Sequence, residues 1–125
     1  MADVPIKIEI FGITTLEGYV DRILAPLTAD ALLDRMPVVK RGRFSFGSKS
    51  YWTLPGLGLR EAVNPKSTKE VKKGDLVYNP KTDELIVVID ELEMPNKVNN
   101  IGKVNINNDI LNARNGLTTK IYKSR

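Results

Sequence analysis

The sequence contains neither cysteine nor histidine. These two absences exclude cysteine nucleophiles, serine–histidine–aspartate triads, imidazole general bases and the common zinc sites, because each of them needs one of the two side chains. Without cysteine there is no disulfide framework either, so we expect a cytoplasmic protein. Any catalysis would have to come from carboxylates, lysine, arginine, tyrosine, serine or threonine.

Long hydrophobic stretches are also missing. The longest apolar run, Leu85 to Ile89, is far shorter than the roughly 20 residues that a membrane span needs. The start of the chain, Met1 to Pro5, has neither the basic nor the apolar region of a signal peptide. With 125 residues, 42% hydrophobic and 27% charged, the composition is that of a globular protein. We therefore expect a single soluble domain over residues 1–125 and no membrane partner.

The net charge of +4 permits contact with polyanions without requiring it. Acidic residues interrupt the basic pattern, as they do on ordinary solvated surfaces. Nucleic-acid binding through the basic groups therefore stays an alternative to a plain solvated surface. The basic groups are Lys40, Arg41 and Arg43, then Lys66, Lys69, Lys72 and Lys73, and finally Lys120, Lys123 and Arg125.

The first half of the chain predicts two hairpins with a helix between them. Residues 6–10 alternate apolar and polar side chains, which is typical of a half-buried strand, and residues 16–23 form its partner. Helical spacing, with Pro26 at the start and Pro37 at the end, predicts a helix over residues 27–36. Residues 43–46 and 49–54 flank Gly47-Ser48, which is typical of a primed hairpin turn.

The second half predicts further strands at residues 76–78, 84–89, 98–106 and 117–122, after an irregular segment from 55 to 73. Gly102 lies inside a predicted strand and indicates a bulge or a close backbone approach. A short helix is expected over residues 109–114. About eight strands and two helices in one small domain favour a mostly β fold, a closed eight-stranded barrel with two short capping helices.

Two motifs with possible chemistry are weak. The segment from Gly42 to Ser50 is close to a phosphate-binding loop, but its lysine comes one residue late and a strand follows. The acidic stretch Asp90 to Glu93 lacks the spacing of a calcium loop. We predict no metal ion and no cofactor, and the sequence identifies no catalytic residue.

Aromatic residues make up only 6% of the chain, yet four of them lie on the predicted hairpin at residues 43–54. They would either pack in the core or form one wall of an apolar groove, with the tyrosine O–H and tryptophan N–H as polar groups. For the groove, the candidate ligand-binding residues are Arg43, Phe46, Tyr51, Trp52, Tyr78 and Glu84.

Several segments resemble cyclophilins. Ala25 to Leu33 is similar to the "AP-x-T-x-x-x-x-L" start of their first helix, and Ile101 to Val104 is similar to their "FGKV" strand. Phe46 to Trp52 and Lys73 to Pro80 are similar to segments of the small prokaryotic cyclophilin-like proteins. The resemblance runs from about Ile6 to Tyr122 and implies a closed eight-stranded barrel capped by two helices.

The residues that cyclophilin prolyl isomerases use do not carry over. Their Phe-His-Arg segment has no counterpart in this chain. Their Gln-Phe-Phe strand corresponds to Glu84-Leu85-Ile86, and their groove histidine to Val98. We therefore expect non-catalytic binding of a small ligand or a peptide segment in a groove on the barrel. A divergent peptidyl-prolyl cis-trans isomerase is the enzyme alternative, with Arg43 as a relocated donor.

Overall fold

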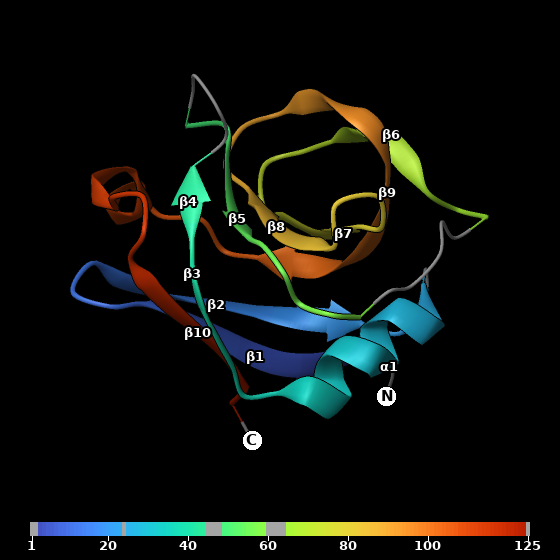
Figure 1. The fold of residues 1–125 in the computed structure, drawn as a ribbon, viewed down its shortest axis with the longest axis horizontal. Helices are drawn as coiled ribbons and strands as arrows, with labels where there is room; N and C mark the ends of the chain where they lie inside the picture. Colours follow the sequence, from blue (N-terminus) through green and yellow to red (C-terminus); the bar gives the residue numbers. More distant parts are fainter. Residues whose placement is uncertain (1–2, 24, 45–48, 60–64, 125) are drawn as a thin grey trace.

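The computed structural model describes residues 3–23, 25–44, 49–59 and 65–124. They form a mostly antiparallel β structure with one α-helix and one short 3-10 helix (Figure 1). The strands are β1 (Asp3–Ile10), β2 (Thr14–Asp21), β3 (Val38–Arg41), β4 (Arg43–Phe44), β5 (Tyr51–Leu54), β6 (Thr68–Val71), β7 (Asp75–Asn79), β8 (Glu84–Val88), β9 (Leu92–Val104) and β10 (Thr118–Lys123). The helices are α1 (Pro26–Arg35) and the 3-10 helix η1 (Asn108–Asn112).

The prediction of a closed eight-stranded barrel with two capping helices is wrong. The structure has a 10-stranded sheet in the order β3-β10-β1-β2-β9-β7-β8-β5-β4, with β6 paired to β9 beside this path. The path has two ends, β3 and β4, so hydrogen bonding does not close it into a barrel. Of the two expected helices, the first is an α-helix and the second is a short 3-10 helix.

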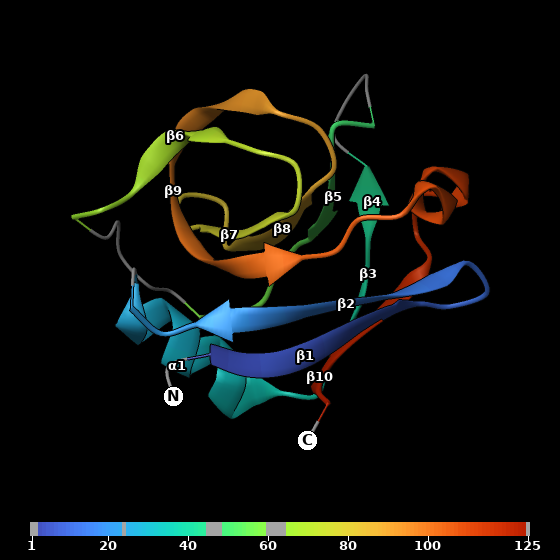
Figure 2. The ribbon, with the colours of Figure 1, turned by 180° about the vertical axis from the view of Figure 1, so that it is seen from behind.

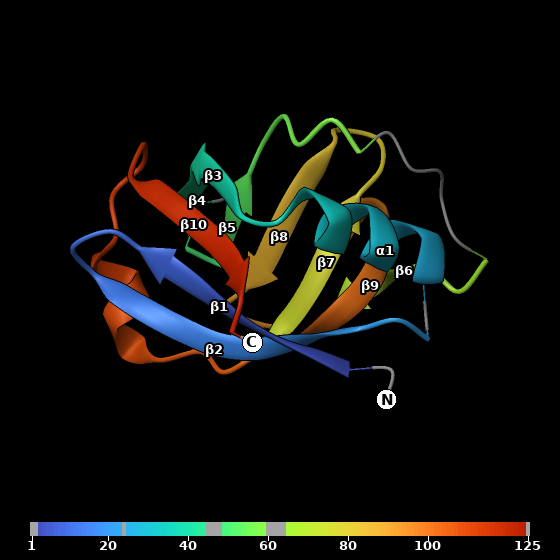
Figure 3. The same ribbon diagram turned by 90° about the horizontal axis from the view of Figure 1, so that it is seen from below.

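The hairpin of β1 and β2 confirms the alternating pattern at residues 6–10. Ile6, Ile8 and Ile10 are buried, and each occupies the face of the sheet that points to the main core. β10 pairs with the other edge of β1, with Ile121 opposite Ile8. Figure 3 shows β10, β1 and β2 side by side, as one wall of the molecule.

Strands β7 and β8 lie at the centre and are buried on both faces. One face, with Leu76, Tyr78, Leu85 and Val87, packs into the main core. The opposite face belongs to a second, smaller apolar cluster that also includes Tyr51 of β5. The second cluster consists of Val71, Val77, Ile86, Val88, Met94 and Val98, with Tyr51 and Leu92 packed against it. Burial on both sides explains the unbroken apolar run of β8.

The long strand β9 covers this second cluster. Its first part pairs with β6 and its last part with β7 and β2, so the chain bends around the central strands (Figures 1 and 2). The β7–β9 register shifts between Leu76 and Val77, whose partners are Gly102 and Asn100. A side chain at Gly102 would overlap the backbone carbonyl of Tyr19. The expected irregularity and close approach at Gly102 are both confirmed.

Helix α1 follows the predicted limits within about one residue and has a proline in its first turn. The buried side chain of Asn99 on β9 donates to the hydroxyl of buried Thr28, at 3.1 Å, and so ties the helix to the sheet. The second predicted helix is the 5-residue 3-10 helix η1, whose cap is Asn107. Among the described residues, no helix has the length and hydrophobicity needed to cross a membrane.

Candidate functional site

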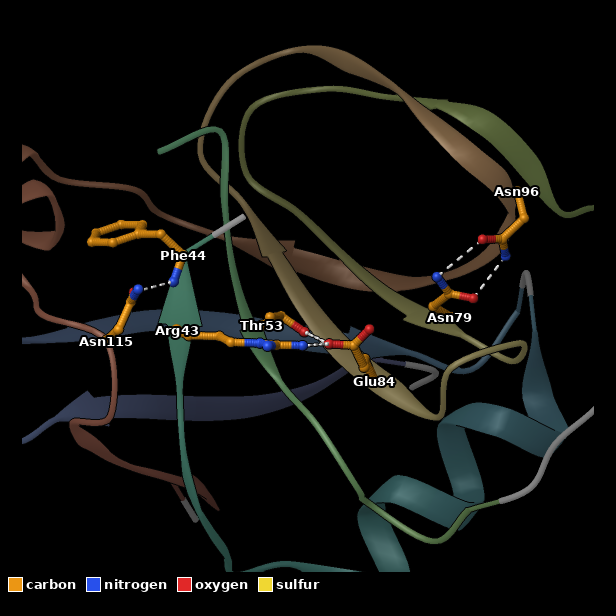
Figure 4. Close-up of polar contacts among 7 residues, drawn as sticks. All are labelled: Arg43, Phe44, Thr53, Asn79, Glu84, Asn96 and Asn115. Carbon is orange, nitrogen blue, oxygen red and sulfur yellow. Dashed lines mark hydrogen bonds and ion pairs between the residues drawn. The ribbon is translucent and has the colours of Figure 1, made fainter. Parts of the chain in front are cut away.

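Three neighbouring strands bring a cation, a hydroxyl and a carboxylate together. Arg43 of β4 lies opposite Thr53 of β5. Strand β5 also pairs with β8, and β8 begins with Glu84. The Thr53 hydroxyl donates to Glu84 Oε2 at 2.8 Å, and Arg43 Nη2 lies 3.6 Å from the same oxygen (Figure 4). All three side chains lie on one face of the sheet, because strand residues two apart point the same way.

Glu84 is contacted by both of the other side chains in this group. Its side chain is 15% exposed, whereas that of Arg43 is 59% exposed. Both contacts use Oε2, and within the described part of the chain Oε1 has no hydrogen-bond partner. Figure 4 shows Oε1 turned away from Thr53 and Arg43. Because it is costly to remove a carboxylate from water, an incompletely paired one at this depth is a candidate for binding a donor.

Two asparagines extend the polar surface across the next strands. Asn79 of β7 lies directly opposite Glu84, and its amide exchanges two hydrogen bonds with Asn96 of β9, at 2.7 and 3.2 Å. Asn79 is 3% exposed and also accepts from the Lys81 N–H. We call the row of Arg43, Thr53, Glu84, Asn79 and Asn96 the polar strip.

Tyr51 lies at the apolar side of the polar strip. It is half-buried, packs against the second cluster and shares the strand face of Thr53. Burial raises the pKa of its hydroxyl, the negative charge of Glu84 raises it further, and the positive charge of Arg43 lowers it. The tyrosine is therefore neutral at pH 7 and can present both an aromatic ring and a hydroxyl.

Two of the residues expected to bind a ligand belong to the main core. Trp52 is 0% exposed, and its indole N–H donates to the Thr119 hydroxyl at 3.1 Å. Tyr78 is also 0% exposed, and its hydroxyl donates to Asp83. We leave both out of the candidate site because their polar atoms are already used inside the protein. Phe46 lies outside the described residues.

The structure thus brings together Arg43, Tyr51 and Glu84 of the expected set. It adds Thr53, Asn79 and Asn96, which the sequence analysis did not single out. The signal was present for Thr53, because it is two residues from Tyr51 on the same strand. Nothing in the sequence indicates that Asn96 meets Asn79, because that contact depends on the bend of β9.

Two charged side chains, Asp83 and Arg35, hold the loop at residues 57–59 in place. The carboxylate of Asp83 accepts from the N–H groups of Gly58 and Leu59. The guanidinium of Arg35 donates to the carbonyls of Leu57 and Gly58, at 3.1 and 2.9 Å. Residues 57–59 are therefore held next to the turn that leads into Glu84.

A hollow of about 470 Å³ lies elsewhere, on the outer side of β1 and β2. Lys7 and Glu17 line it and face each other across the hairpin, with 3.9 Å between Nζ and Oε1. Their side chains are 39% and 71% exposed, which is typical of a solvated ion pair. We prefer the polar strip because Glu84 is far less solvated than either of these groups.

The basic groups do not form an uninterrupted surface on the outer side of β10, β1 and β2. Lys120 lies opposite Glu9, Lys7 lies opposite Glu17, and Lys103 next to β2 pairs with Asp75. Across neighbouring strands such pairs stabilise the sheet. Within the described ranges, no three carboxylates gather in a way that would hold a metal ion.

Comparison with known proteins adds information on the fold alone. No family model matches the sequence, and no curated protein matches it. The hypothetical protein AF2241 from Archaeoglobus fulgidus has a similar structure, with a TM-score of 0.78, 14% identity, and coverage of 98% of this chain and 96% of that one. McbB in complex with tryptophan is also similar, with a TM-score of 0.76 and 13% identity.

The match to McbB covers 95% of this chain but only 44% of McbB, so the chain spans less than half the length of that protein. Neither of these two similar structures identifies a cyclophilin-like family. The resemblance to cyclophilin-like proteins therefore remains a prediction.

Proposed function

We propose that this protein binds a small molecule or a peptide segment at the polar strip without transforming it. The observation that carries the proposal is the carboxylate of Glu84, which is 15% exposed and has one oxygen paired and the other without a partner among the described residues. A ligand N–H group would complete its hydrogen bonding. Arg43 would provide the opposite charge, and Tyr51 an aromatic surface.

The fold is compatible with this proposal. McbB, which shares the fold at 13% identity, is described in complex with tryptophan. Free tryptophan is therefore a reasonable member of a ligand panel, together with short primary amines and a proline-containing tetrapeptide. Small ligands are usually oriented by a few polar groups beside an apolar wall, as at Glu84, Arg43 and Tyr51.

The test is an NMR titration of the isotopically labelled protein with this panel. We expect at least one member to give saturable shifts at Tyr51, at the Arg43 Nε–H and at the Glu84 side chain, and to lose most of its affinity in Glu84→Gln. This substitution keeps the shape and can keep the bond from Thr53. Glu17→Gln, which alters the cross-strand pair with Lys7, is the matched control and should bind normally.

Shifts confined to Lys7, Glu17 and their surroundings would instead assign binding to the hollow on β1 and β2. No saturable shift with any ligand of the panel would refute the proposal.

A further inference from the structure

Arg43 and Glu84 carry opposite charges next to each other, and each keeps hydrogen-bonding atoms that are not used within the described residues. Their separation of 3.6 Å is that of an ion pair, and Arg43 donates no hydrogen bond from its side chain within the described residues. Its guanidinium therefore keeps its N–H donors, and Glu84 keeps Oε1 as an acceptor. Strand pairing fixes the spacing of these groups, since β4 and β8 both pair with β5.

From this arrangement we infer that the ligand is a zwitterion whose ammonium and carboxylate are attached to the same carbon atom, that is, a free α-amino acid. Its ammonium would donate to Glu84 Oε1, and its carboxylate would accept from the Arg43 guanidinium. This inference rests on the proposed function and names the class of ligand for the same site.

Electrostatics favours a zwitterion over an ion with a single charge. Arg43 and Glu84 together carry no net charge, so a simple cation attracted by Glu84 is repelled by Arg43 a few ångströms away. A simple anion meets the reverse situation. An α-amino acid places each of its charges next to the opposite one, and it can make charge-assisted hydrogen bonds at both ends.

The neighbouring side chains favour an apolar or aromatic amino acid. Tyr51 is half-buried on the same face and leads from the charged pair to the second apolar cluster. A ligand side chain can lie on this ring while the charged end stays at the more exposed Arg43. Contact between two aromatic rings contributes binding free energy beyond that of the apolar area that they bury.

The experiment compares three forms of one ligand by NMR titration. L-Phenylalanine carries both charges, L-phenylalanine amide only the ammonium, and N-acetyl-L-phenylalanine only the carboxylate. We expect the amino acid to bind at least tenfold more tightly than either derivative. The amide also represents the N-terminus of a peptide, and the N-acetyl compound its C-terminus.

Two substitutions assign the charges separately. Glu84→Gln should weaken binding of the amino acid and of the amide at least fivefold, and it should not weaken binding of the N-acetyl compound, whose anion is no longer repelled by Glu84. Arg43→Gln should weaken binding of the amino acid and of the N-acetyl compound, and it should not weaken binding of the amide, whose cation is no longer repelled by Arg43. Glu17→Gln controls for a general effect of removing one carboxylate, and the spectra of the free variants show whether each is folded.

If the amide or the N-acetyl compound binds as tightly as the amino acid, the zwitterion inference is wrong, while binding at the polar strip stands. If none of the three compounds binds but another ligand of the panel does, again only the zwitterion inference fails. If nothing in either set binds, both proposals fail together.

Discussion

Gly42 lies directly against the indole ring of Trp52. A β-carbon at position 42 would overlap Nε1 and two carbons of that ring. Gly42 is also the residue between β3 and β4, the two ends of the sheet. Trp52 in turn meets the ring of Phe44 edge-to-face, with 4.9 Å between the ring centroids. The indole thus fills the space that the missing side chain leaves at the point where the chain passes from one end of the sheet to the other.

We predict that Gly42→Ala lowers the free energy of unfolding by about 1–3 kcal/mol, the usual cost of an added methyl group in a filled core. Urea denaturation followed by circular dichroism measures it. The matched background is Trp52→Phe, in which the smaller ring leaves room for the methyl group. There the cost of Gly42→Ala should fall clearly, as a double-mutant cycle would show. An equal cost in both backgrounds would assign the effect to the backbone of residue 42 instead.

A second prediction concerns Asp83, which has a positive φ of 56° and binds the N–H groups of Gly58 and Leu59. Asp83→Ala removes both acceptors and places alanine in a left-handed conformation that it disfavours. Asp83→Asn keeps one acceptor oxygen and a side chain that tolerates this conformation. Amide hydrogen exchange at residues 58 and 59 should therefore accelerate more in the alanine variant than in the asparagine variant. Equal acceleration would contradict this expectation and would mean that the amide oxygen of asparagine cannot replace the carboxylate as an acceptor for the two N–H groups.

The sequence predicted those elements whose signal is local. The β1–β2 hairpin follows from alternation at residues 6–10, α1 from the prolines at both of its ends, and β8 from its apolar run. β3 (Val38–Arg41) and β6 (Thr68–Val71) were not predicted, because each has only four residues, half or more of them polar. A short polar strand is defined by its partners, β10 and β9, and these lie far away in the sequence.

The closed barrel was inferred from the number of strands, and that number cannot show whether the sheet closes. The pairing of Ile8 with Ile121 joins opposite ends of the chain, and no local pattern encodes it. The candidate site shows the same limit at a finer scale. Tyr51 and Trp52 looked equivalent in sequence, yet neighbouring strand residues face opposite sides. Only Tyr51 reaches the polar strip, while Trp52 fills the core.

A third prediction concerns the pKa of Tyr51, which two substitutions should shift in opposite directions. Glu84 raises the pKa of this hydroxyl and Arg43 lowers it, in addition to the larger effect of burial. Glu84→Gln should therefore lower the pKa of Tyr51, and Arg43→Gln should raise it. Both shifts can be followed through the 13Cζ resonance of the tyrosine. Shifts of the same sign in the two variants would contradict the arrangement of charges around Tyr51.

The same raised pKa links folding to alkaline pH. A tyrosine whose pKa is higher in the folded state than the unfolded value of 10.0 binds its proton more tightly when folded. Its contribution to stability is complete below that value and is lost as the pH rises through the folded-state pKa. Tyr51→Phe should therefore reduce the loss of stability above pH ~10, where free tyrosine ionises. An unchanged pH dependence would mean that other groups control alkaline unfolding.

The last prediction concerns the enzyme alternative: we expect little or no prolyl isomerase activity. Rotation about an X–Pro bond faces a barrier of about 18–20 kcal/mol, and lowering it requires a donor that is preorganised towards the prolyl amide. Arg43 lies 3.6 Å from Glu84 Oε2, so the carboxylate offsets the positive charge that such a donor would use. Glu84 would also repel the carbonyl of the substrate.

A protease-coupled assay with Xaa-Pro peptides checks this. With the wild-type protein, the rate of isomerisation should stay close to the uncatalysed rate. The matched variant Arg43→Ala should give the same rate as the wild-type protein. A large rate gain that disappears in Arg43→Ala would overturn the prediction and make Arg43 a catalytic donor. A gain that persists in Arg43→Ala would equally contradict it, and it would show that the donor is a group other than Arg43.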